Sequence, residues 1–274
     1  MKEENITIKT FDGFDLRATL CIPEKIEKIT ILCHGITCDR NEYLNMFSTL
    51  ADRLAEHNIG SLRFDFRGHG ESSGKDLDFD IISQLIDLRS VVEWVKSESD
   101  YRSLPMSFVG TSFGGIPGII YQRIHGAFRA ISLFAPVIAF NPTFVNPTTE
   151  WGMNNFSSMA WEKSKKNGYL MLDGSFRISV RLLEELLVLN PLDMLKQLEA
   201  HVQIFHGTED DLIPCSVVKG LKKQCPLFDI HVVPDMGHGL YVDGDDDGIT
   251  DGSKKIQEEY YYHVTQFLAQ YGKK

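Results

Sequence analysis

The stretch Met106-Ser107-Phe108-Val109-Gly110-Thr111-Ser112-Phe113-Gly114-Gly115 decides how the rest of the chain is interpreted. It is a short apolar run that ends in the pattern Gly-x-Ser-x-Gly, with Ser112 at its centre. A buried strand that turns sharply into a helix at a serine exposes the hydroxyl of that serine, and flanking glycines let neighbouring backbone approach closely. Only three positions of this pattern are fixed, so its meaning depends on whether the chain also supplies a base, an acid and an oxyanion site.

Short apolar runs alternate with amphipathic segments along most of the chain. The runs predict strands at residues 5–11, 15–22, 29–33, 61–66, 107–110, 130–134, 202–205 and 228–233. The first two form an antiparallel pair, because Asp12-Gly13 between them is a favoured hairpin turn. Helical spacing predicts helices at residues 43–56, 79–96 and 113–124 and at the C-terminus. We therefore expect an α/β fold with a mostly parallel central sheet of about eight strands, flanked by helices.

The alternation breaks between residues 137 and 200. Aromatic and Met residues are frequent there, namely Phe140, Phe144, Trp151, Met153, Phe156, Met159, Trp161 and Tyr169. A segment of this length inside an α/β domain is best interpreted as an inserted cap, with a helix at residues 180–188. We therefore expect a core of residues 1–136 and 201–274, with residues 137–200 inserted as a cap after the sixth strand. The aromatic side chains could line a pocket or form the core of the cap, and Trp151 and Trp161 are the first to test.

Composition and charge narrow the class of protein. The chain has 274 residues and a formal net charge of -10, without the concentrated basic patch that nucleic-acid binding needs. No apolar segment approaches the roughly 20 residues of a membrane helix, and the N-terminus does not resemble a secretory signal. Five cysteines without metal-like spacing favour a reducing, cytoplasmic environment. The sequence leaves open whether the chain is a monomer or a homodimer.

Four polar motifs each follow a predicted strand, and they carry His34-Gly35, Ser112, Asp210 and His238. The carboxyl ends of parallel strands meet at one edge of a sheet, so these loops can converge. A serine hydroxyl needs a base to become a nucleophile, and the imidazole that serves as this base needs a carboxylate to fix its tautomer. The order Ser112, Asp210, His238 is that of one fold in particular.

With these motifs the sequence resembles the α/β-hydrolase superfamily. The matching motifs are His34-Gly35, residues 65–72, residues 110–114, residues 206–214 and Gly237-His238. Within the superfamily the chain looks most like bacterial feruloyl and cinnamoyl esterases, with monoacylglycerol-lipase-like enzymes close behind. The pattern from His34 to Arg40 and the single insertion after the sixth strand carry that likeness.

The resemblance implies hydrolysis of small-molecule carboxylic esters through a serine acyl-enzyme, without cofactor or metal. It implies that Ser112 is the nucleophile, His238 the general base and then acid, and Asp210 the residue that orients His238. The backbone amides of Ile36 and Phe113 would form the oxyanion hole. Thioester hydrolysis, amide hydrolysis and acyl transfer remain open with the same triad, as does a ligand-binding module on a silent scaffold.

Several residues carry a second interpretation. Glu209 and Asp211 flank Asp210, but the spacing His-Gly-x-x-Asp-x-x-Ile-Pro selects Asp210, with Asp235 a distant alternative. In the superfamily, the histidine at the position of His69 supports its loop rather than reacting. Two further interpretations are less favoured than inert loops. One is a reactive thiol at Cys38, and the other is a cation site at residues 243–247, where Lys254 occupies the position of the bidentate glutamate of an EF-hand.

Overall fold

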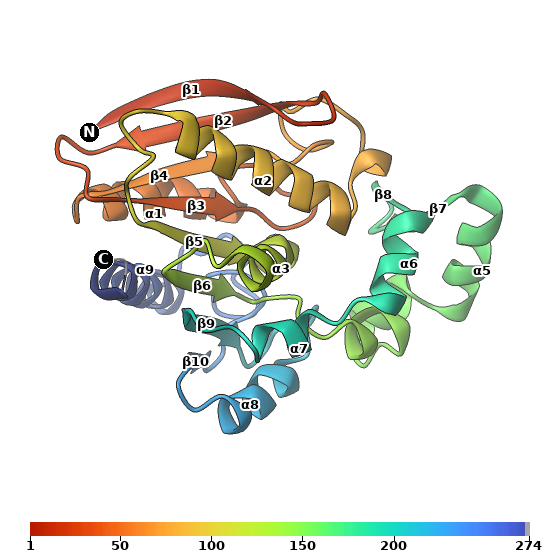
Figure 1. Ribbon diagram of the computed structural model, residues 1–274. Helices are drawn as coiled ribbons and strands as arrows, with labels where there is room; N and C mark the ends of the chain where they lie inside the picture. Colours follow the sequence, from red (N-terminus) through yellow and green to blue (C-terminus); the bar gives the residue numbers. More distant parts are fainter. Residues whose placement is uncertain (272–274) are drawn as a thin grey trace.

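A computed structural model describes residues 1–271 of the chain (Figure 1). Its central sheet has eight strands in the order β1-β2-β4-β3-β5-β6-β9-β10. Strands β1 and β2 are antiparallel, β2 pairs antiparallel with β4, and all remaining pairs are parallel. The bounds are β1 Lys2–Lys9, β2 Asp15–Ile22, β3 Lys28–Cys33, β4 Ile59–Phe64, β5 Met106–Thr111, β6 Ala130–Phe134, β9 His201–Gly207 and β10 Asp229–Val233. This confirms the expected mostly parallel sheet.

Helices cover both faces of the sheet, as the buried parallel strands require. One hydrophobic cluster joins the sheet to α2 (Ile81–Ser97), α3 (Gly115–His125) and α8 (Cys215–Gln224). A second cluster joins the opposite face to α1 (Met46–Ala55) and α9 (Asp251–Tyr271). Strands β3 and β4 are buried along their whole length, which explains the apolar run at residues 29–33 of β3.

Three predicted boundaries are wrong for local reasons. The hairpin between β1 and β2 is a five-residue loop, because Lys9 pairs with Asp15 and the amide of Thr10 donates to the carbonyl of Phe14. Strand β4 ends at Phe64, so Asp65-Phe66 belongs to the following loop. The helix predicted from residue 43 begins at Met46, because Leu44 and Asn45 adopt positive φ angles and interrupt the helical path.

Residues 137–200 follow the sixth strand, and most of them lie beyond one end of the sheet, away from both termini, whereas residues 191–195 lie beside β9 (Figure 1). The predicted helix at residues 180–188 is confirmed as α6 (Val180–Val188). The segment has more regular structure than the sequence pattern predicts. It contains a π-helical turn (Asn141–Val145), α4 (Glu150–Asn155), α5 (Ser158–Asn167), the hairpin of β7 (Tyr169–Leu172) and β8 (Phe176–Ser179), and α7 (Pro191–Leu195).

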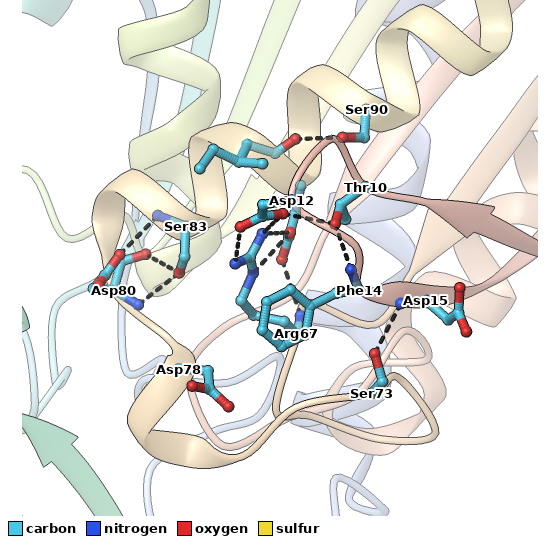
Figure 2. A network of polar contacts seen from close by, with 12 residues as sticks. Thr10, Asp12, Phe14, Asp15, Arg67, Ser73, Asp78, Asp80, Ser83 and Ser90 are labelled. Atoms are coloured by element: carbon cyan, nitrogen blue, oxygen red, sulfur yellow. Dashed lines mark hydrogen bonds and ion pairs between the residues drawn. The ribbon is translucent and has the colours of Figure 1, made fainter.

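A buried ion pair anchors the loop of residues 65–75, which leads from β4 toward α2 (Figure 2). The guanidinium of Arg67 binds Asp87 at 2.6 Å and Asp12 at 2.7 Å, and its Cζ lies 4.3 Å from the ring centre of Phe14. The side chain of Asp87 is fully buried and that of Arg67 is 4% exposed. Loss of one partner would leave a buried charge unpaired, so the pair fixes this loop and the His69 that it carries.

Candidate active site

Ser112 occupies a strained turn between β5 and α3. Its φ of 47° is rare for a residue with a side chain, and a single 3-10 turn separates it from the helix. The flanking glycines permit this packing. A Cβ atom on Gly114 would lie 2.2 Å from the carbonyl oxygen of His34, and one on Gly110 would lie 2.7 Å from the Cα of Gly115. The Gly-x-Ser-x-Gly pattern is therefore a steric requirement of this turn.

The structure brings Ser112, His238 and Asp210 into one hydrogen-bonded row. Nε2 of His238 lies 3.1 Å from Oγ of Ser112, and Nδ1 of His238 lies 2.9 Å from Oδ2 of Asp210. Each residue stands on a loop after a different parallel strand, β5, β9 or β10. The three loops converge at the carboxyl edge of the sheet, which is the arrangement that the sequence predicts.

Asp210 differs from the neighbouring acids in burial and in hydrogen bonding. Its Oδ1 accepts hydrogen bonds from the amides of Leu212 (3.0 Å) and Ile213 (2.8 Å), and its Oδ2 faces Nδ1 of His238 at 2.9 Å and Nε2 of the buried His206 at 3.3 Å. Asp210 is buried, whereas Glu209, Asp211 and Asp235 are exposed. Of these four acids, Asp210 is the one that hydrogen-bonds His238.

The pKa shifts of Asp210 and His238 suit an ionised carboxylate beside an imidazole that readily accepts a proton. Burial alone would raise the pKa of Asp210, but the charge of His238 and its hydrogen bond outweigh burial and lower this pKa. Burial would lower the pKa of His238, but the charge and hydrogen bond of Asp210, followed by the charge of Glu42, raise it above the ordinary value. Asp210 therefore stays ionised, and its charge stabilises an imidazolium at His238.

The two predicted oxyanion donors lie beside Ser112. Ile36 and Phe113 line the same cavity as Ser112. The amide of Ile36 has no internal hydrogen-bond partner within residues 1–271, and that of Phe113 lies in the first helical turn, where amides lack intrahelical acceptors. The carbonyl of Gly35 accepts from the amide of Cys38 and from Nδ1 of His34, which fixes the peptide plane that carries the Ile36 amide.

Two buried neutral histidines support the loop of residues 34–38, which we call the oxyanion loop. Nε2 of His34 accepts from the amide of Phe66, and Nε2 of His69 accepts from the amide of Thr37. Burial lowers the pKa of His34 to about 4, and burial with the neighbouring His34 lowers that of His69 to about 3. Both rings therefore stay neutral near pH 7 and can act as acceptors. This agrees with the expected supporting role of His69.

A cavity of about 240 Å³ opens beside Ser112 and His238. The insertion supplies much of its apolar lining, through Phe144, Trp151, Phe156, Leu172, Ile178 and Leu186. Of the two tryptophans singled out by the sequence, Trp151 lines the cavity and Trp161 does not, and Met153 and Met159 are exposed. Phe144 and Phe156 also belong to the main hydrophobic cluster, so these two rings both line the cavity and pack in the hydrophobic core.

The remaining candidates have ordinary structural roles. Burial raises the pKa of Cys38, which disfavours a thiolate. In the acidic stretch, Oδ2 of Asp245 accepts from the hydroxyls of Thr250 and Ser253. Among residues 1–271, no group of three or more His, Cys, Asp or Glu is arranged to hold a metal ion. In the same part of the chain, no helix combines the length and the apolar character needed to cross a membrane.

One residue of the site was missed by the sequence interpretation. Glu42 lines the cavity and bonds the amide of Gly35 and the hydroxyl of Thr111. It directly precedes the helix predicted from residue 43 and belongs to none of the motifs. Its neighbours Asn41 and Tyr43 form no pattern that would distinguish a buried glutamate from a solvated one.

The sheet order and the strained serine turn define an α/β-hydrolase fold, and the hydrogen-bonded row of Ser112, His238 and Asp210 is its candidate serine hydrolase site. Residues 24–182, more than half of the chain, match the sequence model of the family described as "Serine aminopeptidase, S33". The chain belongs to this family of serine hydrolases.

Relatives and solved structures agree on the fold. Bacillus subtilis YqkD, itself uncharacterized, is 23% identical over 239 residues, which cover 82% of this chain and 70% of YqkD. The Pyrococcus furiosus esterase Pf2001 has a TM-score of 0.71 and 21% identity, with 98% of this chain and 91% of that chain covered. Est1E of Butyrivibrio proteoclasticus with bound ferulic acid has a TM-score of 0.68 and 19% identity, with 94% and 99% covered. At these identities the two structures establish the fold alone.

Proposed function

We propose that this protein is a serine carboxylesterase that acts through Ser112, His238 and Asp210. The observation that carries the proposal is the unbroken row from Oγ of Ser112 through His238 to the buried Asp210, with its serine end in an apolar cavity. A serine in a structural turn needs no imidazole on its hydroxyl, and an imidazole in a structural role needs no buried carboxylate on its other nitrogen.

The chemistry follows from the geometry. Nδ1 of His238 carries a proton that is donated to Asp210, so Nε2 accepts the proton of Ser112 as its Oγ attacks the ester carbonyl. The amides of Ile36 and Phe113 would donate to the oxyanion that develops. His238 then gives its proton to the leaving alcohol, which leaves an acyl group on Ser112. Water attacks this acyl-enzyme with the same assistance from His238, and the acid is released.

The cavity favours small to medium acyl or aryl groups, of the feruloyl or cinnamoyl kind. An apolar cavity of about 150 Å³ admits a benzene ring, so about 240 Å³ admits a substituted ring or a short acyl chain. Within residues 1–271, neither Lys nor Arg lines the cavity, so this lining offers no cation for a phosphate or carboxylate group of the substrate. The ferulic acid in the Est1E structure supports this choice at the level of the fold.

We further propose that residues 137–200 act as a cap on a core of residues 1–136 and 201–274. The support is that this single insertion contributes much of the apolar lining of the cavity, including Phe144, Trp151 and Phe156. Acyl preference would then be set mainly by the insertion, and the chemistry by the core. Replacement of Trp151 by alanine is expected to change KM for aryl esters more than kcat.

Reaction with a fluorophosphonate probe tests the proposal, with Ser112→Ala as the matched control. We expect labelling of the wild-type protein alone, and hydrolysis of p-nitrophenyl acetate, butyrate and ferulate esters that is lost in Ser112→Ala. Acyl-CoA, monoacylglycerol and amino-acid 4-nitroanilide substrates run in parallel. Faster turnover of any of these than of simple esters would replace carboxylesterase by thioesterase, lipase or amidase, and an inert wild-type protein would favour a silent binding scaffold.

A further inference from the structure

Glu42 is a buried carboxyl that the proposed triad mechanism does not use. One oxygen, Oε1, accepts hydrogen bonds from the amide of Gly35 at 3.2 Å and from the hydroxyl of Thr111 at 2.5 Å. The other oxygen, Oε2, is buried and has no hydrogen-bond partner among residues 1–271, although the thiol of Cys38 lies close enough to the carboxyl to oppose the rise of its pKa. Burial of a carboxyl oxygen without a hydrogen bond costs free energy, so a buried glutamate beside the cavity points to a role in the site.

The two residues that hydrogen-bond Glu42 lie on the two segments that carry the proposed oxyanion hole and the nucleophile. Gly35 precedes Ile36 in the oxyanion loop, and Thr111 precedes Ser112. A single oxygen therefore ties the oxyanion loop to the turn of the nucleophile. The spacing between these segments is tight, because a Cβ atom on Gly35 would lie 3.3 Å from both Oε1 of Glu42 and Cβ of Ser112.

The backbone at Glu42 is strained in a way that serves this contact. Its φ of 64° and ψ of 172° lie in a region that is almost exclusive to glycine. Leu44 and Asn45 follow with positive φ angles as well. Strain of this kind persists only where the surroundings impose it, and here it turns the carboxyl inward to the site instead of outward to solvent.

The charge of Glu42 also acts on the base. Burial raises the pKa of Glu42, while the hydrogen bond from Thr111 and the charge of His238 oppose the rise. In return, the charge of Glu42 adds to that of Asp210 in raising the pKa of His238. The other titratable groups around the imidazole are Asp211, His206 and Tyr241, and those around Glu42 are Cys38 and Tyr260.

We propose that Glu42 is a positioning residue of this site, which clamps the oxyanion loop to the nucleophile turn and places a second carboxylate beside His238. The first role needs only an acceptor oxygen, whereas the second needs the charge. The two roles can therefore be separated by substitution. The proposal rests on the proposed hydrolase function for its kinetic part only, since the effect on His238 can be measured without a substrate.

Three variants separate the roles. Glu42→Gln keeps an oxygen that can accept from Gly35 and Thr111 but removes the charge. Glu42→Gly removes both, and glycine suits the positive φ, so the backbone is not strained further. Glu56→Gln is the matched control, because Glu56 is an exposed glutamate at the end of α1. Thermal melting curves show which variants are folded.

The first readout is the titration of the His238 imidazole by NMR in the free protein, with the signal assigned by its absence in His238→Gln. We expect Glu42→Gln to lower the pKa of His238 by roughly one unit, as the loss of a nearby opposite charge does. Glu56→Gln should leave it unchanged. An unchanged His238 pKa in folded Glu42→Gln would refute the electrostatic role.

The second readout is the rate of labelling by a fluorophosphonate, together with kcat and KM for a p-nitrophenyl ester. We expect about a tenfold lower rate in Glu42→Gln and about a 10²- to 10³-fold lower rate in Glu42→Gly, the range found when an oxyanion donor is lost. The loss should fall on kcat and leave KM within twofold. A folded Glu42→Gly with a wild-type rate would refute the clamp, and if that variant does not fold, Thr111→Val decides in the same way.

An inert wild-type protein would refute the hydrolase function and not the assignment of Glu42 to the site. If the His238 pKa still falls in Glu42→Gln, the second carboxylate stands as an electrostatic partner of the imidazole. If the protein is inert and the pKa does not move, both proposals fail. The two failures are therefore distinguishable.

Discussion

Asp210→Asn is the substitution for which the structure gives the sharpest expectation. Two backbone amides, those of Leu212 and Ile213, donate to Oδ1 of Asp210, so an asparagine would keep its carbonyl oxygen at that position. Its NH₂ group would then replace Oδ2 and face Nδ1 of His238. Because NH₂ is a donor, it would select the tautomer with the proton on Nε2, which cannot accept the proton of Ser112.

The size of the effect follows from the wrong tautomer. In a serine triad this change lowers kcat by about 10⁴-fold, which corresponds to about 5 kcal/mol of transition-state stabilisation at 1.36 kcal/mol for each factor of ten. The side chain is nearly isosteric, Asp210 does not itself line the cavity, and an asparagine keeps the oxygen that accepts from Leu212 and Ile213, so KM and the melting temperature should change little. The loss should therefore appear almost entirely in kcat.

The assay is steady-state hydrolysis of p-nitrophenyl butyrate, paired with the second-order rate of fluorophosphonate labelling. Asp211→Asn and Glu209→Gln are the matched controls, because both residues are exposed neighbours of Asp210. We expect both controls within about threefold of the wild-type protein. A folded Asp210→Asn within tenfold of wild type, or an equal loss in Asp211→Asn, would refute the assignment of the orienting acid.

Three further outcomes follow from the structure. The value of kcat/KM should rise with pH to a plateau through a pKa above 6.5, because the raised pKa of His238 keeps the base protonated at lower pH; a profile flat between pH 5 and 9 would contradict this. Gly114→Ala should lose at least tenfold in labelling rate and about 1–3 kcal/mol in the free energy of unfolding in urea, because its Cβ would overlap the carbonyl of His34. Arg67→Met should lower the free energy of unfolding by about 3–5 kcal/mol by leaving Asp87 unpaired, and Arg67→Met combined with Asp87→Leu should recover most of it.

The sequence was sufficient for the sheet and for the triad candidates because both leave local marks. Strands buried on both faces read as apolar runs, and the steric demands of the serine turn leave a fixed glycine pattern around Ser112. The choice among Glu209, Asp210 and Asp211 needed only the spacing to the following Ile213-Pro214. Burial and the two amide hydrogen bonds of Asp210 explain why that spacing is informative.

The sequence interpretation failed where conformation depends on contacts between distant segments. Glu42 and Leu44 belong to residue types that ordinarily prefer helix, so their positive φ angles have no signature in the sequence. Asn45 tolerates such an angle but does not by itself mark the interruption. The pattern therefore predicts the helix start three residues early and does not distinguish Glu42. The hairpin of β7 and β8 is absent from the predicted strands although its turn does have a local sequence signature. Its turn contains Asp173-Gly174, both with positive φ, and the same type of dipeptide, Asp12-Gly13, predicts the first hairpin.

The supports of the oxyanion loop suggest why the fold and the site depend on each other. His34 fixes the peptide plane of Gly35, His69 holds Thr37 from the loop of residues 65–75, and the Arg67–Asp87 pair holds that loop in turn. None of these groups touches a substrate in the proposed mechanism, yet each restrains the backbone that carries the Ile36 amide. An oxyanion donor displaced by a fraction of an ångström loses most of its effect, so rigidity at these distant contacts is itself a requirement of the chemistry. Burial of His34, His69 and the Arg67–Asp87 pair costs stability. We infer that these buried polar groups are kept because they hold the oxyanion loop rigid.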